Sequence, residues 1–150
     1  MIKPILTIVR GLPGSGKTTY ARKLAAETGA MLIEPDALLV RGGVYWYTQG
    51  RYKAARGCAD RILGMAMYTG CKEAIGCDVV YADVLPTRFD IMCLIEIVGA
   101  MYGYTTVTVI DMPLLTVDES MARNRHAVRR KDIERMAREW QPWEVGGADV

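Results

Sequence analysis

The sequence predicts an α/β fold in which a mostly parallel sheet is flanked by helices. Two observations carry this prediction: apolar runs of strand length alternate with helical segments, and the first run leads directly into a glycine-rich loop that opens a helix. The chain of 150 residues is long enough for one compact domain. We expect that domain to span residues 1–143 and residues 144–150 to form a frayed tail.

Four runs along the chain have the length and composition of strands. The first is apolar and β-branched and reads as a central strand, and the second is ended by Pro35. The predicted strands cover residues 5–9, 31–34, 78–83 and 105–110. Between the second strand and the next helix, residues 41–50 are rich in glycine and aromatic residues and predict a loop.

Helical periodicity fills the intervals between the strands. The first helix begins at Lys17, and Gly29 suits its C-cap. The second carries one stripe, made of Ala55, Cys58, Ala59, Ile62 and Ala66, and ends near Gly70. The third follows Pro86 and has an apolar face at Ile91, Leu94, Ile95, Val98 and Met101. Thr116 and Glu119 have the capping-box spacing of a short helix. The last helix buries Ile133, Met136, Ala137 and Trp140.

Composition and charge narrow the class of protein. Hydrophobic residues make up 51% of the chain and charged residues 24%, which is ordinary for a soluble globular protein. No apolar run reaches the roughly 18 residues of a membrane span, and the N-terminal run reads as a strand and not as a signal peptide. The 4 cysteines form no metal-like pair, so we expect reduced, mostly buried thiols in a cytoplasmic protein.

A phosphate-binding loop is the strongest motif. The segment "GLPGSGKT", residues 11–18, satisfies G-x-x-x-x-G-K-[ST], with a strand before it and a helix after it. Its backbone N–H groups can surround phosphate oxygens, and the helix adds its positive end. We expect Lys17 to reach the β- and γ-phosphates of ATP and Thr18 to offer its hydroxyl to Mg²⁺. The expected nucleotide-binding residues are Gly11, Pro13, Gly14, Ser15, Gly16, Lys17, Thr18 and Thr19.

The rest of the chain favours a kinase over a switch or a motor. A guanine-specific [NT]-K-x-D element is absent from the sequence, and the third strand ends in a single acid, Asp83, where motors place two in a row. A small kinase needs only the phosphate-binding loop, an acid that accepts the acceptor's proton, and a basic lid over the transferring group.

Asp36, just past the second predicted strand, is the candidate for that acid. The carboxyl edge of an open α/β sheet is where ligands bind. Asp36 is also placed to act as a helix N-cap. Glu34 is the second candidate, although an ordinary salt bridge suits it better. Asp83 has two interpretations of equal weight. It either holds the magnesium shell or orients the acceptor, or it caps the turn into Pro86.

Residues 123–131, "RNRHAVRRK", hold five formal cations and no acid, although the net charge of the chain is only +2. We call them the basic segment and interpret them as a lid, because guanidinium groups match phosphate oxygens. Arg123 and Arg125 are the leading catalytic candidates, ahead of Arg129 and Arg130. The alternative is a solvated helix face. His126 is expected to shape the loop and not to act as a base.

With these motifs in place, the chain resembles the family of polynucleotide 5′-hydroxyl kinases and related phage and bacterial P-loop kinases. The matching segments are "GLPGSGKTTYARKL", "IEPDAL", "VVYADVLPTRFD", "YGYTTVTVID" and "SMARNRHAVRRKDIERMAREWQPW". The resemblance implies a P-loop kinase domain with an arginine-rich lid near the C-terminus. It implies Lys17 and Thr18 on the phosphates and Mg²⁺, Asp36 as general base, and an arginine of residues 123–125 on the transferring group.

Two departures from the family fall on the acceptor side. Leu38 and Leu39 occupy the place of an arginine that holds the acceptor's phosphate, with Arg41 the nearest substitute, and Asp83 is followed by Val84 in place of the family's D-[TN]-N. These departures favour considering an acceptor other than a 5′ end as well. The resemblance implies a nucleic-acid acceptor, DNA in preference to RNA, that is either a 5′ end or the hydroxymethyl group of 5-hydroxymethyluracil, as in a phage relative. A phage-encoded enzyme would act in the host cytoplasm.

An aromatic and cationic stretch, "VYWYTQGRYK" at residues 44–53, bears on the acceptor. Its rings and cations suit the stacking of a nucleobase beside phosphate contacts: Tyr45, Trp46, Tyr47, Tyr52, Arg51 and Lys53. Packing of some of these rings on the core is the alternative. A small-molecule kinase acting on a nucleoside, nucleotide or metabolite, and a nucleotide-binding ATPase module, remain open at this point, as do the oligomeric state and the choice between ATP and GTP.

Overall fold

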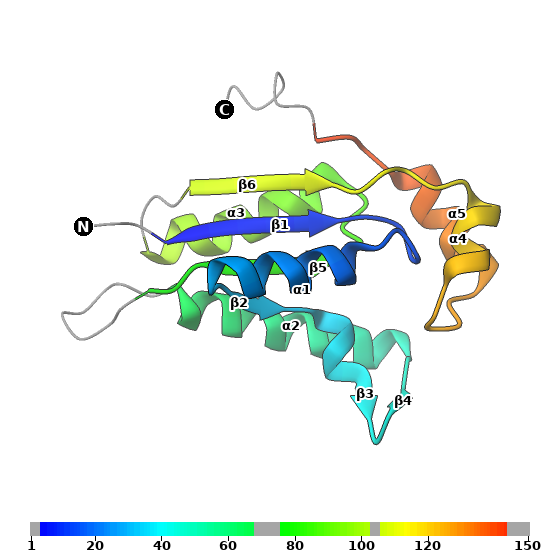
Figure 1. Cartoon of the computed structure of the whole chain (residues 1–150), viewed down its shortest axis with the longest axis horizontal. Helices are drawn as coiled ribbons and strands as arrows, with labels where there is room; N and C mark the ends of the chain where they lie inside the picture. Colours follow the sequence, from blue (N-terminus) through cyan, green and yellow to red (C-terminus); the bar gives the residue numbers. More distant parts are fainter. Residues whose placement is uncertain (1–3, 68–75, 103–105, 144–150) are drawn as a thin grey trace.

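A computed structural model of the chain describes residues 4–67, 76–102 and 106–143 (Figure 1). Within that part, a 4-stranded parallel sheet has the order β2-β5-β1-β6. Its strands are β1 (Ile5–Arg10), β2 (Met31–Ile33), β5 (Val79–Asp83) and β6 (Thr106–Asp111). The predicted α/β class with a parallel sheet is confirmed. Because the strands are parallel, their carboxyl ends meet at one edge of the sheet.

Three helices pack on the two faces of the sheet, and two more lie at its carboxyl edge. Figure 1 shows α1 (Lys17–Thr28) on one face and α2 (Gln49–Ala66) and α3 (Arg88–Tyr102) on the other. The helices α4 (Val117–Arg123) and α5 (Arg130–Glu139) lie beyond the ends of β1 and β6. No helix in the described part of the chain has the length and apolar character that crossing a membrane requires.

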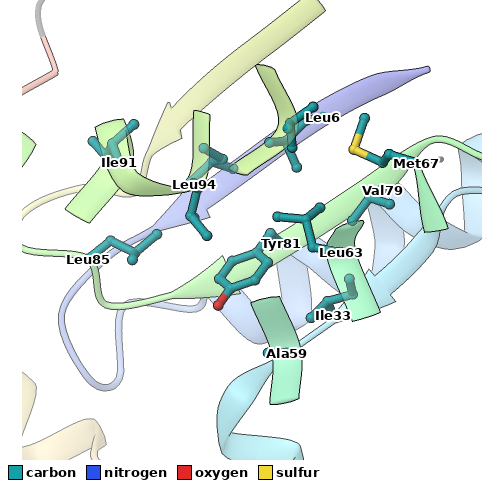
Figure 2. Packing of buried hydrophobic residues seen from close by; sticks show 12 residues of the cluster. Leu6, Ile33, Ala59, Leu63, Met67, Val79, Tyr81, Leu85, Ile91 and Leu94 are labelled. Carbon is teal, nitrogen blue, oxygen red and sulfur yellow. The ribbon is translucent and has the colours of Figure 1, made fainter. Parts of the chain in front are cut away.

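The core has two layers, one on each face of the sheet. On the α2 and α3 face, strand residues such as Leu6 and Tyr81 pack against Leu63 and Leu94 (Figure 2). On the α1 face, small residues meet the strands: Ala21 and Ala25 pack near Val9, Val80 and Ala82. Alanine side chains let α1 approach the sheet closely, which fixes the position of the loop that opens the helix.

Residues 41–50, predicted as a loop, are partly a hairpin, so that prediction is wrong in part. After the 3₁₀ helix η1 (Pro35–Leu39), strands β3 (Val40–Arg41) and β4 (Val44–Tyr45) pair antiparallel. Gly42 and Gly43 join them with φ values of 56° and 78°. Two central residues with positive φ match the right-handed twist of a short hairpin, and glycine adopts them without strain. α2 then begins at Gln49, with Thr48 as its cap.

Other local predictions are mostly confirmed. Gly29 caps α1 in the left-handed region, and Thr116 and Glu119 form the predicted capping box. The expectation of mostly buried thiols is wrong for Cys58, which is exposed, while Cys77 and Cys93 are half-buried. The buried stripe of α2 runs through Ala55, Ala59 and Leu63, which turns Cys58 toward solvent. Cys71, the side chain of Met101 and the tail at 144–150 lie outside the described residues.

Residues 140–143 lie across the carboxyl edge of the sheet, and we call them the C-terminal strap. Arg10, the last residue of β1, is fully buried beneath it, with Nε 2.8 Å from Asp111 Oδ1 and the guanidinium carbon 4.0 Å from the Trp140 ring centroid. Arg10 also donates to the carbonyl of Gln141, and the Gln141 N–H donates to Pro86 O at 2.8 Å. The strap thus ties the C-terminal helices to the strand that precedes the phosphate-binding loop.

Candidate active site

The phosphate-binding loop has the geometry that its sequence predicts. The Ser15 N–H donates to Leu12 O at 3.0 Å and closes a turn, and Gly16 sits at the N-cap of α1 with a φ of 86°. The first N–H groups of α1 have no partner within the helix and point to the loop, where an anion is stabilised. The predicted nucleotide-binding residues differ in burial: Gly11, Pro13 and Lys17 are buried, Gly14, Ser15 and Thr18 half-buried, and Gly16 and Thr19 exposed.

The end of α4 lies directly on this loop. The buried hydroxyl of Ser120 donates to Pro13 O at 2.5 Å. A Cβ at Gly14, where φ is 79°, would lie 2.7 Å from Arg123 Cβ and 3.0 Å from its carbonyl carbon. Only glycine fits there without displacing the backbone of Arg123. Of the two leading lid candidates, Arg123 is therefore adjacent to the phosphate-binding loop.

Lys17 is buried at 9% exposure, and three carboxylates lie near enough to act on its charge. Burial lowers its pKa, and the charges of Asp83, Asp36 and Glu34 oppose that shift. These three carboxylates come from the ends of β5 and β2, which lie side by side in the sheet. The fold thus brings the predicted Lys17, Asp36 and Asp83 to one place.

Asp36 lies in the first turn of η1, where its carboxylate meets a tyrosine. The Tyr45 hydroxyl donates to Asp36 Oδ1 at 2.8 Å. Burial, and next the Asp36 charge, raise the pKa of Tyr45, so the tyrosine remains a hydrogen-bond donor. The alternative role of Asp36 as an N-cap is wrong, because Glu34 occupies the N-cap position of η1. Glu34 makes the salt bridge expected of it, 3.5 Å from Arg22.

Asp83 ends β5 and is buried at 1% exposure. Its Oδ2 accepts from the Tyr52 hydroxyl at 2.7 Å and from Arg56 Nη1 at 3.3 Å, and its Oδ1 accepts from Val84 N at 2.8 Å. Burial raises the pKa of Asp83, and the Arg56 charge opposes this. The Val84 bond accords with the predicted role at the turn after the strand.

Sequence reasoning missed the part that α2 plays in holding Asp83. Tyr52, Arg56 and Asp60 follow at intervals of four residues and form a polar stripe, in which Asp60 accepts from the Tyr81 hydroxyl at 3.1 Å. That spacing is the signal available in the sequence. Tyr52, one of the rings expected to stack a nucleobase, is half-buried, and its hydroxyl is bound to Asp83.

The donor set at this edge fits a magnesium ion held mainly by phosphates and water. The described residues hold no group of three or more His, Cys, Asp or Glu side chains arranged around a metal position. Mg²⁺ in phosphoryl-transfer sites typically takes only one or two protein ligands beside the substrate's phosphates. The half-buried Thr18, in the first turn of α1, and Asp83 are the side chains of that type.

The basic segment divides into groups with different surroundings. Arg129 pairs with Asp132 at 3.0 Å, and Arg130 pairs with Asp118 at 2.7 Å and Glu134 at 3.1 Å. These surface pairs match the solvated helix face that was the alternative to a lid. Arg125 is exposed and forms no ion pair within the described residues.

His126 is exposed, and its ring lies against Tyr45. Its ring centroid lies 4.4 Å from that of Tyr45, with 31° between the planes. Asn124 braces the turn: its Nδ2 donates to Val128 O at 2.8 Å, and its Oδ1 accepts from His126 N at 3.1 Å. The expectation that His126 shapes the loop agrees with this geometry, and the tyrosine contact was not visible in the sequence.

A cleft of about 750 Å³ opens beside Asp36, with Tyr45 as its shared wall. One side is formed by the start of α2 and the segment before it, and the other by the basic segment and α5. Its lining residues are Tyr45, Tyr47, Thr48, Gln49, His126, Ala127, Val128, Arg129, Asp132 and Arg135. Aromatic faces, two arginines and hydrogen-bonding groups thus surround a space next to the proposed base.

Comparison with known proteins supports this description of the fold. The AAA_33 family model, described as an AAA domain, matches residues 6–77, which include the phosphate-binding loop and Asp36. Comparison with curated protein sequences gives no match.

Solved structures resemble nearly the whole chain. A chain in the structure of the Pnkp1/Rnl/Hen1 RNA repair complex is similar with a TM-score of 0.70 and 15% identity, over 93% of this chain and 44% of that one. A gluconokinase from Sinorhizobium meliloti 1021 is similar with a TM-score of 0.58 and 16% identity, over 95% of this chain and 78% of that one. A sugar kinase from Janibacter sp. HTCC2649 is similar with a TM-score of 0.61 and 19% identity, over 96% of this chain and 81% of that one. The fold of this chain is therefore that of a P-loop kinase domain.

Proposed function

We propose that this protein is an ATP- and magnesium-dependent phosphotransferase that moves the γ-phosphate of ATP to a hydroxyl group of a nucleic acid. The acceptor is a 5′-hydroxyl end or the hydroxymethyl group of 5-hydroxymethyluracil in DNA. The observation that carries the proposal is the convergence of Lys17 with Asp36 beside an aromatic and cationic cleft. A kinase needs a cleft for its acceptor beside the base, whereas a nucleotide-hydrolysing switch uses water as the acceptor.

On the donor side, the chain supplies fixed positive groups. The N–H groups of the loop and of the first turn of α1 bind the phosphates, and Lys17 stabilises charge on the transferring group. Arg123, held against Gly14, is the arginine placed to reach the same phosphates. Bound Mg²⁺ would neutralise phosphate charge, with Thr18 and Asp83 as its protein contacts.

On the acceptor side, Asp36 takes the proton of the attacking hydroxyl. Tyr45 occupies Oδ1, which leaves Oδ2 for the acceptor. The hydroxyl oxygen then forms a bond to the γ-phosphorus as the bond to the β–γ bridging oxygen breaks, and ADP leaves. Lys17 and Arg123 hold the phosphoryl oxygens in line for this displacement.

The groups around the cleft support a nucleobase-containing acceptor. Tyr47 and Trp46 are half-exposed at 46% and 49%, and the Arg51 guanidinium carbon lies 5.7 Å from the Trp46 ring. Aromatic rings stack bases, and Arg129 and Arg135 suit a phosphate backbone. A second candidate, a small hydroxyl-rich acceptor, is favoured by Thr48, Gln49 and Asp132 in the same lining, because these groups hydrogen-bond hydroxyls.

The proposal is tested by phosphate transfer from γ-labelled ATP with Mg²⁺. Four acceptors are offered in parallel: 5′-hydroxyl oligonucleotides, duplex DNA containing 5-hydroxymethyluracil, free nucleosides and gluconate. We expect label on a polymer, with binding that weakens as salt is raised. Label confined to nucleosides or gluconate would select the second candidate, and release of free phosphate alone would overturn the kinase proposal.

Two variants and a control test the assigned residues. Asp36→Asn should lower the turnover number by about 100-fold or more, without weakening ATP binding, because general-base catalysis is lost. Lys17→Ala should lower both transfer and ATP affinity. Glu34→Gln, a change of the acid two residues before Asp36, should retain most activity. Loss of activity in Glu34→Gln with retention in Asp36→Asn would reassign the base to Glu34.

A further inference from the structure

We propose that Tyr45 is a positioning residue that couples the orientation of Asp36 to the closed position of the basic segment over the phosphate-binding loop. The inference rests on the proposed function of Asp36 as base. It adds a device that makes acceptor activation depend on the same segment that covers the donor phosphates.

The first link joins Tyr45 to the base. Tyr45 is the last residue of β4, and the hairpin is held to the end of η1 by Trp46 N–H, which donates to Leu39 O at 2.9 Å. Since Asp36 lies in η1, this bond fixes the two segments against each other. The 2.8 Å bond from the Tyr45 hydroxyl then restrains rotation of the Asp36 carboxylate.

The second link joins Tyr45 to the basic segment. Its ring faces His126 at 4.4 Å and lies nearly parallel to the Tyr47 ring, 6.2 Å away with 12° between the planes. Tyr45 is only half-buried, and both rings lie within 6.2 Å of its ring centroid. Withdrawal of His126 would remove one of the two and free the tyrosine to change rotamer.

The third link joins His126 to the phosphate-binding loop. Only two residues separate His126 from Arg123, whose backbone touches Gly14. Asn124 braces the intervening turn through its bonds to Val128 and His126, and Ala127 holds a φ of 51°. A turn so braced ties the position of His126 to that of Arg123, which lies against the phosphate-binding loop.

These links predict that loss of the Tyr45 hydroxyl changes the turnover number but not the KM for ATP. Without the hydroxyl of Tyr45, Asp36 remains in place but samples more orientations, so fewer bound acceptors meet Oδ2 correctly. None of the altered groups belongs to the phosphate-binding loop. The turnover number should therefore fall while the KM for ATP stays unchanged.

The kinetic experiment compares hydroxyl removal at Tyr45 with hydroxyl removal at a tyrosine outside the site. Tyr45→Phe should lower the turnover number about 10-fold. Tyr20→Phe, the matched control on the exposed side of α1, should leave it unchanged. His126→Ala should also lower the turnover number, and His126→Phe, which keeps a ring for stacking, should restore it. The double variant Tyr45→Phe/His126→Ala should be no slower than the slower single variant, because both changes break one route.

A spectroscopic experiment tests the contact independently of activity. His126 is the only histidine, so its Cε1 proton gives a single imidazole resonance in one-dimensional NMR spectra. Stacking on Tyr45 shifts that resonance by the ring current of the tyrosine. Tyr45→Leu should move the resonance to the position of a free imidazole, and Tyr47→Leu should move it much less.

The outcomes separate this inference from the proposed function. An active wild-type enzyme with an unchanged turnover number in Tyr45→Phe would overturn the inference alone. An unmoved histidine resonance in Tyr45→Leu would do the same, because the second link would be absent. A wild-type protein that transfers phosphate to no acceptor would overturn the proposed function, and the inference with it.

Discussion

At the residue scale, Lys17 is a buried cation, and its burial costs hydration free energy. An ammonium at 9% exposure has lost most of its hydration, and the nearby Asp83 and Asp36 charges offset only part of that loss. A buried cation of this kind gains its full partner only when phosphates bind. In the free protein, Lys17 therefore loses its proton more readily than a lysine in water does.

The lowered pKa of Lys17 predicts that ATP binding takes up protons at alkaline pH. Bound phosphates raise the pKa of the ammonium again, so Lys17 gains a proton on binding. By linkage, ATP affinity falls as pH rises through the pKa of the free protein. Calorimetric titrations at alkaline pH below the ordinary lysine pKa of about 10.4, in two buffers with different ionisation heats, measure the uptake directly.

The control for this prediction is Lys17→Arg. The guanidinium stays charged at that pH, so its binding should involve no proton uptake from this position. Equal uptake by wild type and Lys17→Arg would assign the proton to another group and remove Lys17 from the explanation.

At the element scale, α4 is an anchored helix and not a freely moving lid. Its N-terminus is closed by the Thr116 and Glu119 capping box, and its buried Ser120 is bonded to Pro13 of the phosphate-binding loop. Within the part of the chain that the structure describes, residues 124–131 form no side-chain hydrogen bond to that loop. In the segment interpreted as a lid, Arg123 thus ends an anchored helix, and His126 lies in the turn beyond it.

The anchor predicts a nucleotide-specific effect for Ser120→Ala. Losing the hydroxyl leaves Pro13 O unsatisfied and lowers the free energy of unfolding by about 1 kcal/mol. It also frees the end of α4 from the loop, so the KM for ATP should rise. Denaturant titration and steady-state kinetics measure the two effects.

Thr116→Ala provides the comparison on the same helix. It removes the cap and lowers the free energy of unfolding by a similar amount, about 1 kcal/mol, without touching the loop. Its KM for ATP should stay near that of the wild type. If both variants raised the KM equally, the effect would come from loosening α4 in general and not from the Pro13 contact.

At the scale of the whole molecule, Arg10 joins the start of the chain to the C-terminal strap. It is fully buried at the end of β1, beside Asp111 of the neighbouring strand and Trp140 of the strap. Trp143 packs on the core on the α2 and α3 face. The strap thus closes the carboxyl edge next to the strand that leads into the site.

Removing Arg10 should therefore destabilise the protein strongly. Arg10→Leu leaves Asp111 without its buried partner and breaks the bond to Gln141, so we expect the free energy of unfolding to fall by about 3 kcal/mol. Arg88→Ala removes an exposed hydrogen bond to the same strap, from Arg88 Nε to Pro142 O at 3.0 Å. It should lower the free energy of unfolding by no more than about 1 kcal/mol. Equal denaturation midpoints for Arg10→Leu and wild type would show that the strap does not depend on this arginine.

The sequence by itself determined the donor side of the site. Strand alternation, the phosphate-binding motif and the caps at Gly29 and Thr116 are local signals, because each depends on neighbours a few residues away. The parallel sheet followed from the same alternation. Asp36 and Asp83 were found because each lies at or just past the end of a predicted strand, and parallel strands end at one edge.

Only the tertiary structure decided what surrounds those acids. Tyr52 and Arg56 reach Asp83 because α2 packs along β5, Tyr45 reaches Asp36 because a hairpin folds back, and His126 meets Tyr45 across the cleft. These contacts join residues of different elements, and their geometry depends on how whole elements pack. Periodicity and motifs encode the local conformation of each element, whereas the pairing of side chains between elements is fixed only when the core forms.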